Sequence, residues 1–225
     1  MLRELIRILL DRKTIIDKMG IEFMTMLKTG RDMFVSATDL LYLGGDDKEV
    51  YEKIYPQDKE LNKLECKIRS EVVTHISASG ADNLATMLIF MSVVKDAERI
   101  GDYIKNTYEV AVKVKDFKQG KYGKQTLDIR NEIVSKFGNV MAVFSDSDEK
   151  AAIECVKKIS KMQKQCDGII DELLTSKTEN SAAYALVVRY FKRILAHLSN
   201  IVTAVIMPVN KLDYFDEDSI SELHE

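Results

Sequence analysis

The sequence predicts an all-α protein: a tandem repeat of two antiparallel three-helix bundles, with a short extra helix at the N-terminus. Three observations support this fold class. Apolar residues return every three or four positions through nearly the whole chain, which is the spacing of a helix face. The 225 residues include only two prolines and ten glycines, and so few breakers favour long helices over strands. The helical pattern also occurs twice, on either side of a segment that lacks it.

The first half of the chain is predicted to contain the extra helix and three longer ones. Residues 1–12 form the extra amphipathic helix, and the next helix ends at Gly44-Gly45. Asp46, with Glu49 three residues on, has the pattern of a helix start, and Pro56 predicts a kink or a fresh start within that helix. A break at residues 79–82 precedes the third. The apolar faces of the three longer helices are Ile16, Met19, Phe23, Met26, Met33, Ala37, Leu40; Ile54, Leu61, Leu64, Ile68, Val72; and Ile89, Val93, Ala97, Ile100, Ile104, Tyr108, Ala111.

The second half repeats this organisation after a linker at residues 116–125, which has two glycines, four charged residues and no helical stripe. The predicted organisation is 1–115 for the extra helix and first repeat, 126–208 for the second repeat, and 209–225 for an acidic tail. Pro208 ends the last helix. The three apolar faces are Ile133, Phe137, Val140, Phe144; Ala152, Cys155, Ile159, Met162, Cys166, Ile169, Leu173; and Val187, Phe191, Ile194, Leu198, Val202, Val205.

Composition excludes several classes of protein. The net charge of −3 comes from nearly balanced acidic and basic residues, so the chain lacks the basic footprint of a nucleic-acid-binding protein. Cys155 and Cys166 fall on apolar helix positions, where small buried thiols suit a reducing cytoplasm. The first ten residues carry charges within their apolar run, unlike a signal peptide. No segment approaches the roughly 20 apolar residues of a membrane span. We therefore expect a cytoplasmic protein whose link to a membrane runs through a partner.

One run of polar residues indicates a site. Glu98, Asp102 and Asn106 recur every four residues, so they share one helix face, and that face lies opposite the apolar stripe, toward the predicted bundle surface. Asp58 and Asn62 form a second pair with the same spacing on the preceding helix. Such oxygen ligands suit hard cations, iron or manganese. The alternative is a set of solvated charges with Arg99 and Lys105 as counter-ions, and spacing alone favours that alternative.

The run Glu98-Arg99-Ile100-Gly101-Asp102 closely resembles the signature of the PhoU family, and Asp58-Lys-Glu-Leu-Asn62 resembles the family's element on the preceding helix. The resemblance covers residues 20–206, and it is specific in the first half but architectural in the second. It implies two three-helix bundles, commonly a dimer, and acidic clusters that hold iron or another divalent metal without an organic cofactor. It also implies a role in damping phosphate uptake and signalling beside a phosphate transporter and its sensor kinase. The metal ligands expected here are Glu98, Asp102 and Asp58, with Asn62 and Asn106 as weaker candidates.

The second repeat departs from this pattern. When residue 98 is set on residue 192, Lys192 and Ala196 occupy the positions of Glu98 and Asp102. The preceding helices match with a different offset, which places Gln163 at the position of Asp58. A lysine among the ligands repels a cation, so this second site is expected to be lost. His197, beside the lost position, is interpreted as a surface or packing residue rather than a ligand.

Three functions are compared. The first is a regulatory module that controls phosphate uptake by protein–protein contact. The second, a carboxylate-bridged metalloenzyme, would need paired Glu-x-x-His motifs, and the sequence has none. The third is a detached cytosolic domain of a sodium-phosphate cotransporter. The sequence favours a regulator that is not an enzyme, with the N-terminal segment Leu2–Ile6 and the acidic segment Asp213–Asp218 as candidate contacts.

Overall fold

The protein is described by a computed structural model, which gives the backbone of residues 2–211 and the side chains of residues 15–211. Its elements are α1 (Leu2–Leu43), α2 (Asp47–Ser79), α3 (Leu84–Lys113), α4 (Gly120–Asp146), α5 (Glu149–Thr175), α6 (Ser181–Ile206) and a 3₁₀ turn, η1 (Val209–Lys211). Residues 2–211 contain no β-strand. The predicted all-α class is confirmed.

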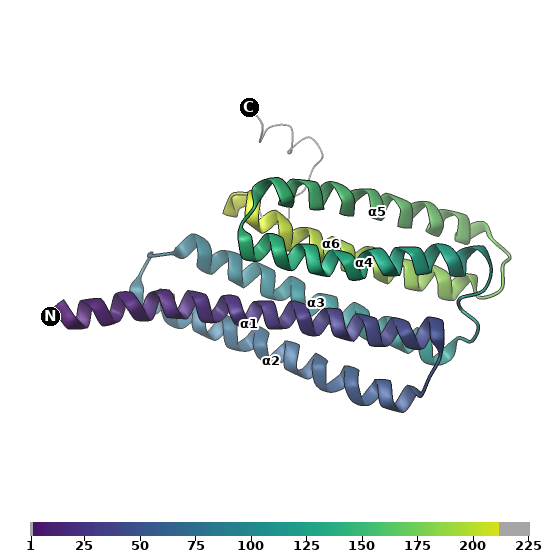
Figure 1. The fold of residues 1–225 in the computed structure, drawn as a ribbon, viewed down its shortest axis with the longest axis horizontal. Coiled ribbons are helices and arrows are strands. Elements are labelled where there is room, and N and C mark those ends of the chain that lie inside the picture. Colours follow the sequence, from purple (N-terminus) through teal and green to yellow (C-terminus); the bar gives the residue numbers. More distant parts are fainter. Residues whose placement is uncertain (1, 212–225) are drawn as a thin grey trace.

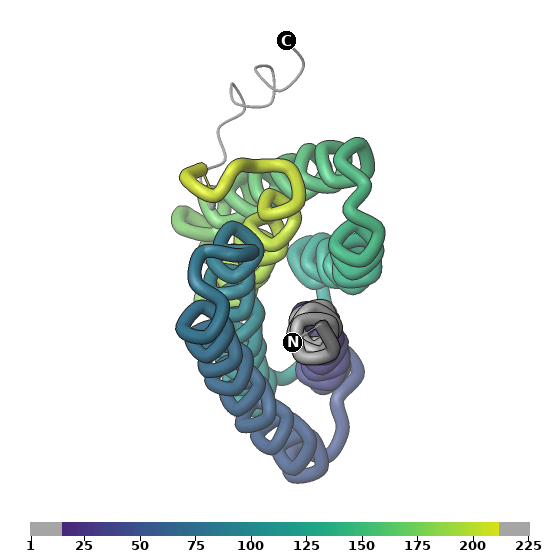
Figure 2. Tube along the Cα trace, turned by 90° about the vertical axis from the view of Figure 1, so that its left-hand side faces the viewer, coloured from purple at the N-terminus to yellow at the C-terminus, as the bar shows by residue number. Residues whose placement is uncertain are grey.

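The long helices run side by side along one axis (Figure 1). Contacts between α2 and α3, α3 and α6, and α6 and α5 define one layer of four helices, and α1 and α4 lie against it as a second layer (Figure 2). The α3 helix contacts α1, α2 and α6, so it is covered on three sides. All six helices contribute to one continuous set of buried apolar side chains. This arrangement is consistent with two three-helix repeats, α1–α3 and α4–α6, that share a core.

Most predicted helix ends are confirmed. Gly44 and Gly45, with φ of 75° and 144°, follow α1. Asp46 caps α2, its side chain accepting a hydrogen bond from the Lys48 backbone N–H, and Gly80 caps its end. The last long helix ends at Ile206, two residues before Pro208. These signals are local, because glycine tolerates the positive φ of a helix end and proline cannot continue a helix.

The N-terminal region differs from the prediction. The α1 helix is continuous from Leu2 to Leu43, so residues 2–12 belong to it and form no separate helix. No glycine or proline lies before Gly20, and charged residues alone do not end a helix. The α2 helix likewise continues through Pro56 without a fresh start. Pro56 and Glu52 are exposed, so the Glu52 carbonyl, which loses its helical partner, can bind water instead.

The connection between the repeats is shorter than the predicted linker. The α4 helix begins at Gly120, so residues 120–125 form its first turns. The glycines in this segment serve close packing as well as a turn. A Cβ on Gly123 would lie 2.3 Å from the backbone carbon of Lys118 and 2.7 Å from the Phe117 oxygen. The Tyr184 hydroxyl of α6 donates to the carbonyls of Phe117 and Gln119, at 2.7 and 3.0 Å. The loop is therefore held against both α4 and α6.

We expect Gly123→Ala to destabilise the protein by about 1–3 kcal/mol, because the added methyl group must displace backbone rather than a flexible side chain. Denaturant unfolding measures this change. Gly138→Ala is the matched control on the same helix, since a Cβ there meets nothing within 4 Å, and it should be neutral or stabilising by up to about 1 kcal/mol. Equal effects of the two substitutions would contradict the close approach at Gly123.

The cysteine predictions are also confirmed. Cys155 and Cys166 are buried and unbonded, whereas Cys66 is exposed. Burial raises the pKa of the Cys155 thiol, and it raises the pKa of the Cys166 thiol to about 12. Both buried thiols therefore remain protonated at neutral pH and act as small core residues.

Candidate functional site

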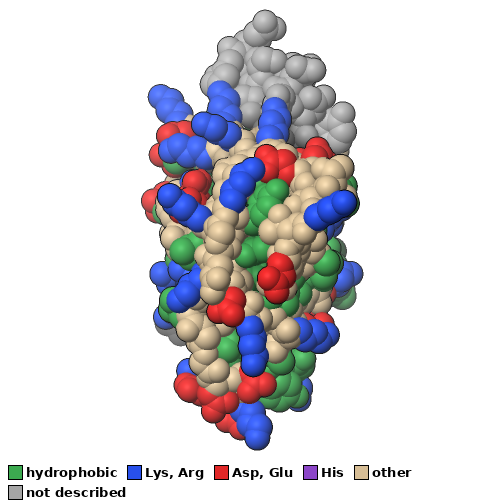
Figure 3. Space-filling model, turned by 90° about the vertical axis from the view of Figure 1, so that its right-hand side faces the viewer, with side chains coloured by type: hydrophobic (Ala, Val, Ile, Leu, Met, Phe, Trp, Pro, Cys, Tyr) green, Lys and Arg blue, Asp and Glu red, His purple; other side chains and the backbone are tan. Residues whose placement is uncertain are grey.

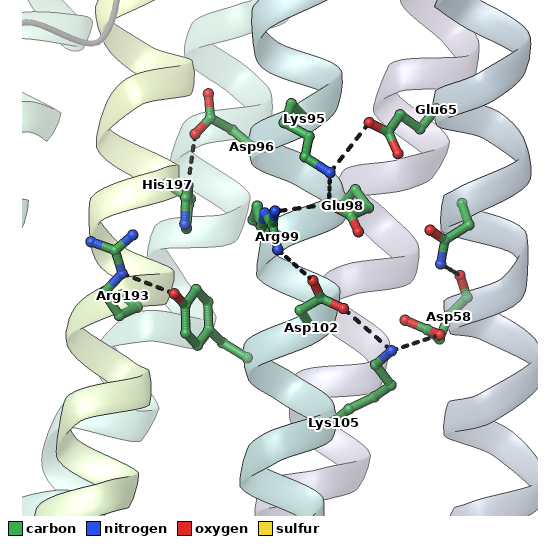
Figure 4. Close-up of polar contacts among 12 residues, drawn as sticks. Asp58, Glu65, Lys95, Asp96, Glu98, Arg99, Asp102, Lys105, Arg193 and His197 are labelled. Carbon is green, nitrogen blue, oxygen red and sulfur yellow. Dashed lines mark hydrogen bonds and ion pairs between the residues drawn. The ribbon is translucent and has the colours of Figure 1, made fainter.

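The polar motif lies between α2 and α3. We call this region the charged seam, and it consists of Asp58, Asn62, Glu65 and Arg69 of α2 with Lys95, Glu98, Arg99, Asp102 and Lys105 of α3. The predicted ligands Glu98, Asp102 and Asp58 all lie in it, although Asp58 is at least 40 residues from the α3 motif in sequence. The residues of the sequence motif therefore lie side by side with residues of α2 in the seam (Figure 4).

The prediction that this face lies toward the bundle surface is wrong for Glu98, and the partner acid Asp58 on α2 is buried as well. Glu98 and Asp58 are only 8% and 9% exposed, whereas the Asp102 side chain is 31% exposed. The physical reason is the central place of α3 in its layer. Its apolar stripe faces α1, but its flanks are covered by α2 and α6, so a polar face beside the stripe is also buried.

The glycine of the motif lies where the two helices contact each other. A Cβ on Gly101 would lie 2.7 Å from Leu61 Cδ1 and 3.8 Å from Asp58 Oδ1. A larger residue would force the Leu61 side chain to move. Glycine at position 101 therefore leaves room for the Leu61 side chain against α3.

Each carboxylate of the seam faces a cation of the chain itself. Lys105 Nζ lies 2.9 Å from Asp58 Oδ2 and 3.3 Å from Asp102 Oδ1. Lys95 Nζ lies 2.7 Å from Glu98 Oε2 and 3.6 Å from Glu65 Oε1. Two further ion pairs lie within single helices. Arg99 is 3.1 Å from Asp102 on α3, and Arg69 is 3.1 Å from Glu65 on α2. The seam is an ion-pair network that crosses between two helices (Figure 4).

The two weaker candidates contribute little to a ligand set. The Asn62 amide donates to the backbone oxygen of Asp58 at 2.9 Å, within its own helix. Asn106 lies one turn beyond Asp102, and no hydrogen bond joins it to the three carboxylates in the described part of the chain. Neither side chain bridges α2 and α3.

The electrostatics keep Lys105 charged. Burial alone would lower the pKa of Lys105, but hydrogen bonds and charge attraction from Asp58 and Asp102 outweigh it, so the pKa is raised. A protonated ammonium therefore stays between the two aspartates at neutral pH. The residues present do not fit a divalent ion while Lys105 and Lys95 keep these positions. Among residues 15–211, no group of three or more acidic, histidine or cysteine side chains has a metal-binding arrangement.

The second repeat has a simpler version of the same seam between α5 and α6. Lys192 lies at the position of Glu98, and its Nζ is 2.6 Å from Asp167 Oδ2. Asp167 lies at the position of Asn62. The neighbouring positions hold Gln163 and Ala196, so this seam has one carboxylate, which one lysine neutralises.

A second polar cluster, which the sequence analysis missed, joins the two repeats across α3 and α6. His197 Nδ1 lies 2.7 Å from Asp96 Oδ1, and the Asn200 amide donates to the same oxygen at 3.0 Å. The His197 ring stacks on Tyr103 at a centroid distance of 5.8 Å, and Arg193 Nε donates to the Tyr103 hydroxyl at 3.1 Å. Asp96 and His197 are both buried, so the interpretation of His197 as a surface residue is wrong and that of a packing residue is right.

The fold and the seam define a class of protein. It is all-helical, and its first set of three helices carries the acidic motif. Residues 23–111 match the family model of the PhoU domain. A curated relative from Synechocystis, the "Phosphate-specific transport system accessory protein PhoU homolog", is 24% identical over 169 residues, which cover 68% of this chain and 71% of the relative. Residues 23–111 are therefore similar to the PhoU domain, as the sequence motif predicted.

The fold comparison extends this similarity beyond the matched domain. The crystal structure of the "phosphate transport system regulatory protein PhoU" from Streptococcus pneumoniae has a TM-score of 0.73 to this chain, at 18% sequence identity. The match covers 88% of this chain and 95% of the Streptococcus pneumoniae chain. The PhoU-like fold therefore includes the second repeat, where the sequence resemblance is weakest. None of the helices described here is both long and apolar enough to cross a membrane.

Proposed function

We propose that this protein regulates phosphate transport by binding a phosphate transporter or its sensor kinase, and that it catalyses no reaction. The observation that carries the proposal is the PhoU domain at residues 23–111, which contains the whole charged seam. The two similar proteins are described as a transport-system accessory protein and a transport-system regulatory protein. These descriptions support a regulator over a cotransporter domain. A cytoplasmic location and a homodimer belong to the same proposal.

The chemistry of the polar clusters supports binding over catalysis. The charges of the seam face one another in ion pairs at 2.7–3.6 Å. His197 is buried against Asp96 and Tyr103. These groups hold helices together and leave the outer surface to recognise a partner.

One end of the molecule offers a surface for such a partner. Figure 3 looks onto the end where α1, α3 and α5 finish, and it shows apolar patches among interspersed acidic and basic side chains. The exposed apolar side chains at this end are Leu43, Tyr51, Val112, Leu174 and Leu186. Leu43 and Leu174 are 73% and 74% exposed. Exposed apolar groups with a charged rim are typical of transient protein–protein contacts. The two terminal segments proposed from the sequence lie outside the described side chains.

A deletion strain of the source organism tests the proposal. In high phosphate, loss of the gene should raise phosphate uptake and accumulation, and the intact gene should restore the parental level. We expect Leu43→Asp/Leu174→Asp to fold but to complement poorly, because a charge at each apolar contact opposes docking. Val73→Asp is the matched control, since Val73 is 59% exposed on α2 away from this end.

Unchanged phosphate uptake in the deletion strain would refute the regulatory function itself. Full complementation by the double variant would refute only the docking surface. Helical content measured by circular dichroism confirms that each variant is folded, so that a failure to complement reports on binding rather than on stability.

A further inference from the structure

We propose that the charged seam is neutralised by the chain's own lysines, with Lys105 in the place where a metal ion would bridge Asp58 and Asp102. The folded protein would then hold its α2–α3 seam together without a metal ion. This inference departs from the metal cluster that the PhoU resemblance implies, and it concerns the charges of this particular chain.

The position of Lys105 carries the first step. Its Nζ is shared by Asp58 Oδ2 and Asp102 Oδ1, one from each helix, at 2.9 and 3.3 Å. An ion bridging these oxygens would lie about 2.0–2.6 Å from each of them. An ammonium group and a metal ion cannot occupy that space together. The Lys105 side chain is only 24% exposed, so surrounding atoms hold it in place.

The expected ligands are also divided between two lysines. Lys95 draws Glu98 toward Glu65, at 2.7 and 3.6 Å, while Lys105 draws Asp102 toward Asp58. Figure 4 shows the two groups at different levels of the seam, one on either side of Arg99. Glu98 therefore does not point at the same centre as Asp58 and Asp102. A metal site would need both groups to be rebuilt around one ion.

The net charge of the seam leaves no need for an added cation. Its ion pairs join four carboxylates to four cations: Asp58, Glu65, Glu98 and Asp102 with Arg69, Lys95, Arg99 and Lys105. Buried carboxylates require compensation, and here the compensation is complete within the described part of the chain. A divalent ion would add two uncompensated positive charges to a balanced network, and it would lie close to the ammonium group of Lys105, which repels it.

The same solution occurs in the second repeat, which is an independent observation. Lys192 neutralises Asp167 between α5 and α6, and this lysine comes from a different position of the repeat than Lys105. Two seams that differ in sequence thus both use a lysine as the cation.

Removing Lys105 should uncover a cation site. We expect the purified wild-type chain to contain substoichiometric metal, and its melting temperature to be unchanged by EDTA or Mn²⁺. Lys105→Ala should melt at a lower temperature in EDTA and rise by about 5 °C or more when Mn²⁺ is in hundredfold excess over its Kd. Elemental analysis after dialysis gives the stoichiometry. Lys192→Ala is the matched control, because Asp167 alone is too weak a ligand set to retain Mn²⁺.

Lys105→Gln keeps much of the side chain's stem and decides the question if Lys105→Ala does not fold. Mn²⁺ binding by either Lys105 variant, together with none by Lys192→Ala, supports the proposal. Stoichiometric metal in the wild-type protein, lost in Glu98→Ala/Asp102→Ala, would overturn it. So would Lys105 variants that bind no more Mn²⁺ than Lys192→Ala. Neither outcome depends on the regulatory function, since both are measured on the purified chain.

Discussion

His197→Ala is expected to lower the free energy of unfolding by about 1–3 kcal/mol, the range found when a buried polar group loses its hydrogen-bond partner. Asp96 is 6% exposed, and its carboxylate would keep only the Asn200 amide as a partner. The variant also loses the ring stacked on Tyr103. Because Asp96 lies on α3 and His197 on α6, the loss falls on the junction between the two repeats.

Denaturant unfolding of four proteins tests this result: wild type, His197→Ala, Asp96→Ala and the double variant. Asp96→Ala should also be destabilising, because it removes the hydrogen-bond partner shared by His197 and Asn200. The double variant should cost less than the sum of the two, since the second substitution removes the group that the first left without its hydrogen-bond partner. Asp171→Ala, at an exposed position of α5, should change stability by no more than about 0.5 kcal/mol. A His197 variant as stable as this control would mean that the buried pair does not form.

The helices themselves could be predicted because their signals are local. Apolar spacing located all six long helices, and Gly44, Gly80 and Pro208 marked their ends. The helix predictions failed where a local sequence rule allows more than one structure. Nothing between residues 12 and 16 breaks a helix, so α1 is continuous. Gly120 and Gly123 indicated a loop, but one sits at the start of α4 and the other allows backbone to approach it.

The candidate site was predictable in composition but not in arrangement. The spacing of Glu98 and Asp102 placed both on one face of α3. It could not show that the face is covered, because the cover comes from α2. The Lys105–Asp58 contact spans 47 residues of sequence and the His197–Asp96 contact spans 101. Such pairs depend on how the helices pack against one another. A local sequence pattern does not indicate that packing. The pairs within α3, such as Arg99 with Asp102, follow from spacing and correspond to the counter-ion alternative.

Phe191→Ala is expected to destabilise the protein by about 3–5 kcal/mol, as for other fully buried phenylalanines. The Phe191 side chain on α6 is fully buried, and its ring lies 5.3 Å from that of Phe34 on α1, which in turn lies 6.0 Å from Phe137 on α4. This aromatic cluster joins the first repeat to the second. Truncating one ring leaves a cavity that rigid helices fill only partly.

The position of Phe191 also makes the variant a test of how the two halves fold. Because the buried apolar set is continuous through all six helices, we expect a single unfolding transition whose midpoint shifts as a whole. Circular dichroism, which reports on all helices, and tyrosine fluorescence, which sums the nine tyrosines of both halves, should show the same midpoint. Leu186→Ala, at a half-exposed position of the same helix, should shift it little. Two separate transitions, with only the second half destabilised, would instead favour independent domains divided at the predicted boundary of residues 116–125.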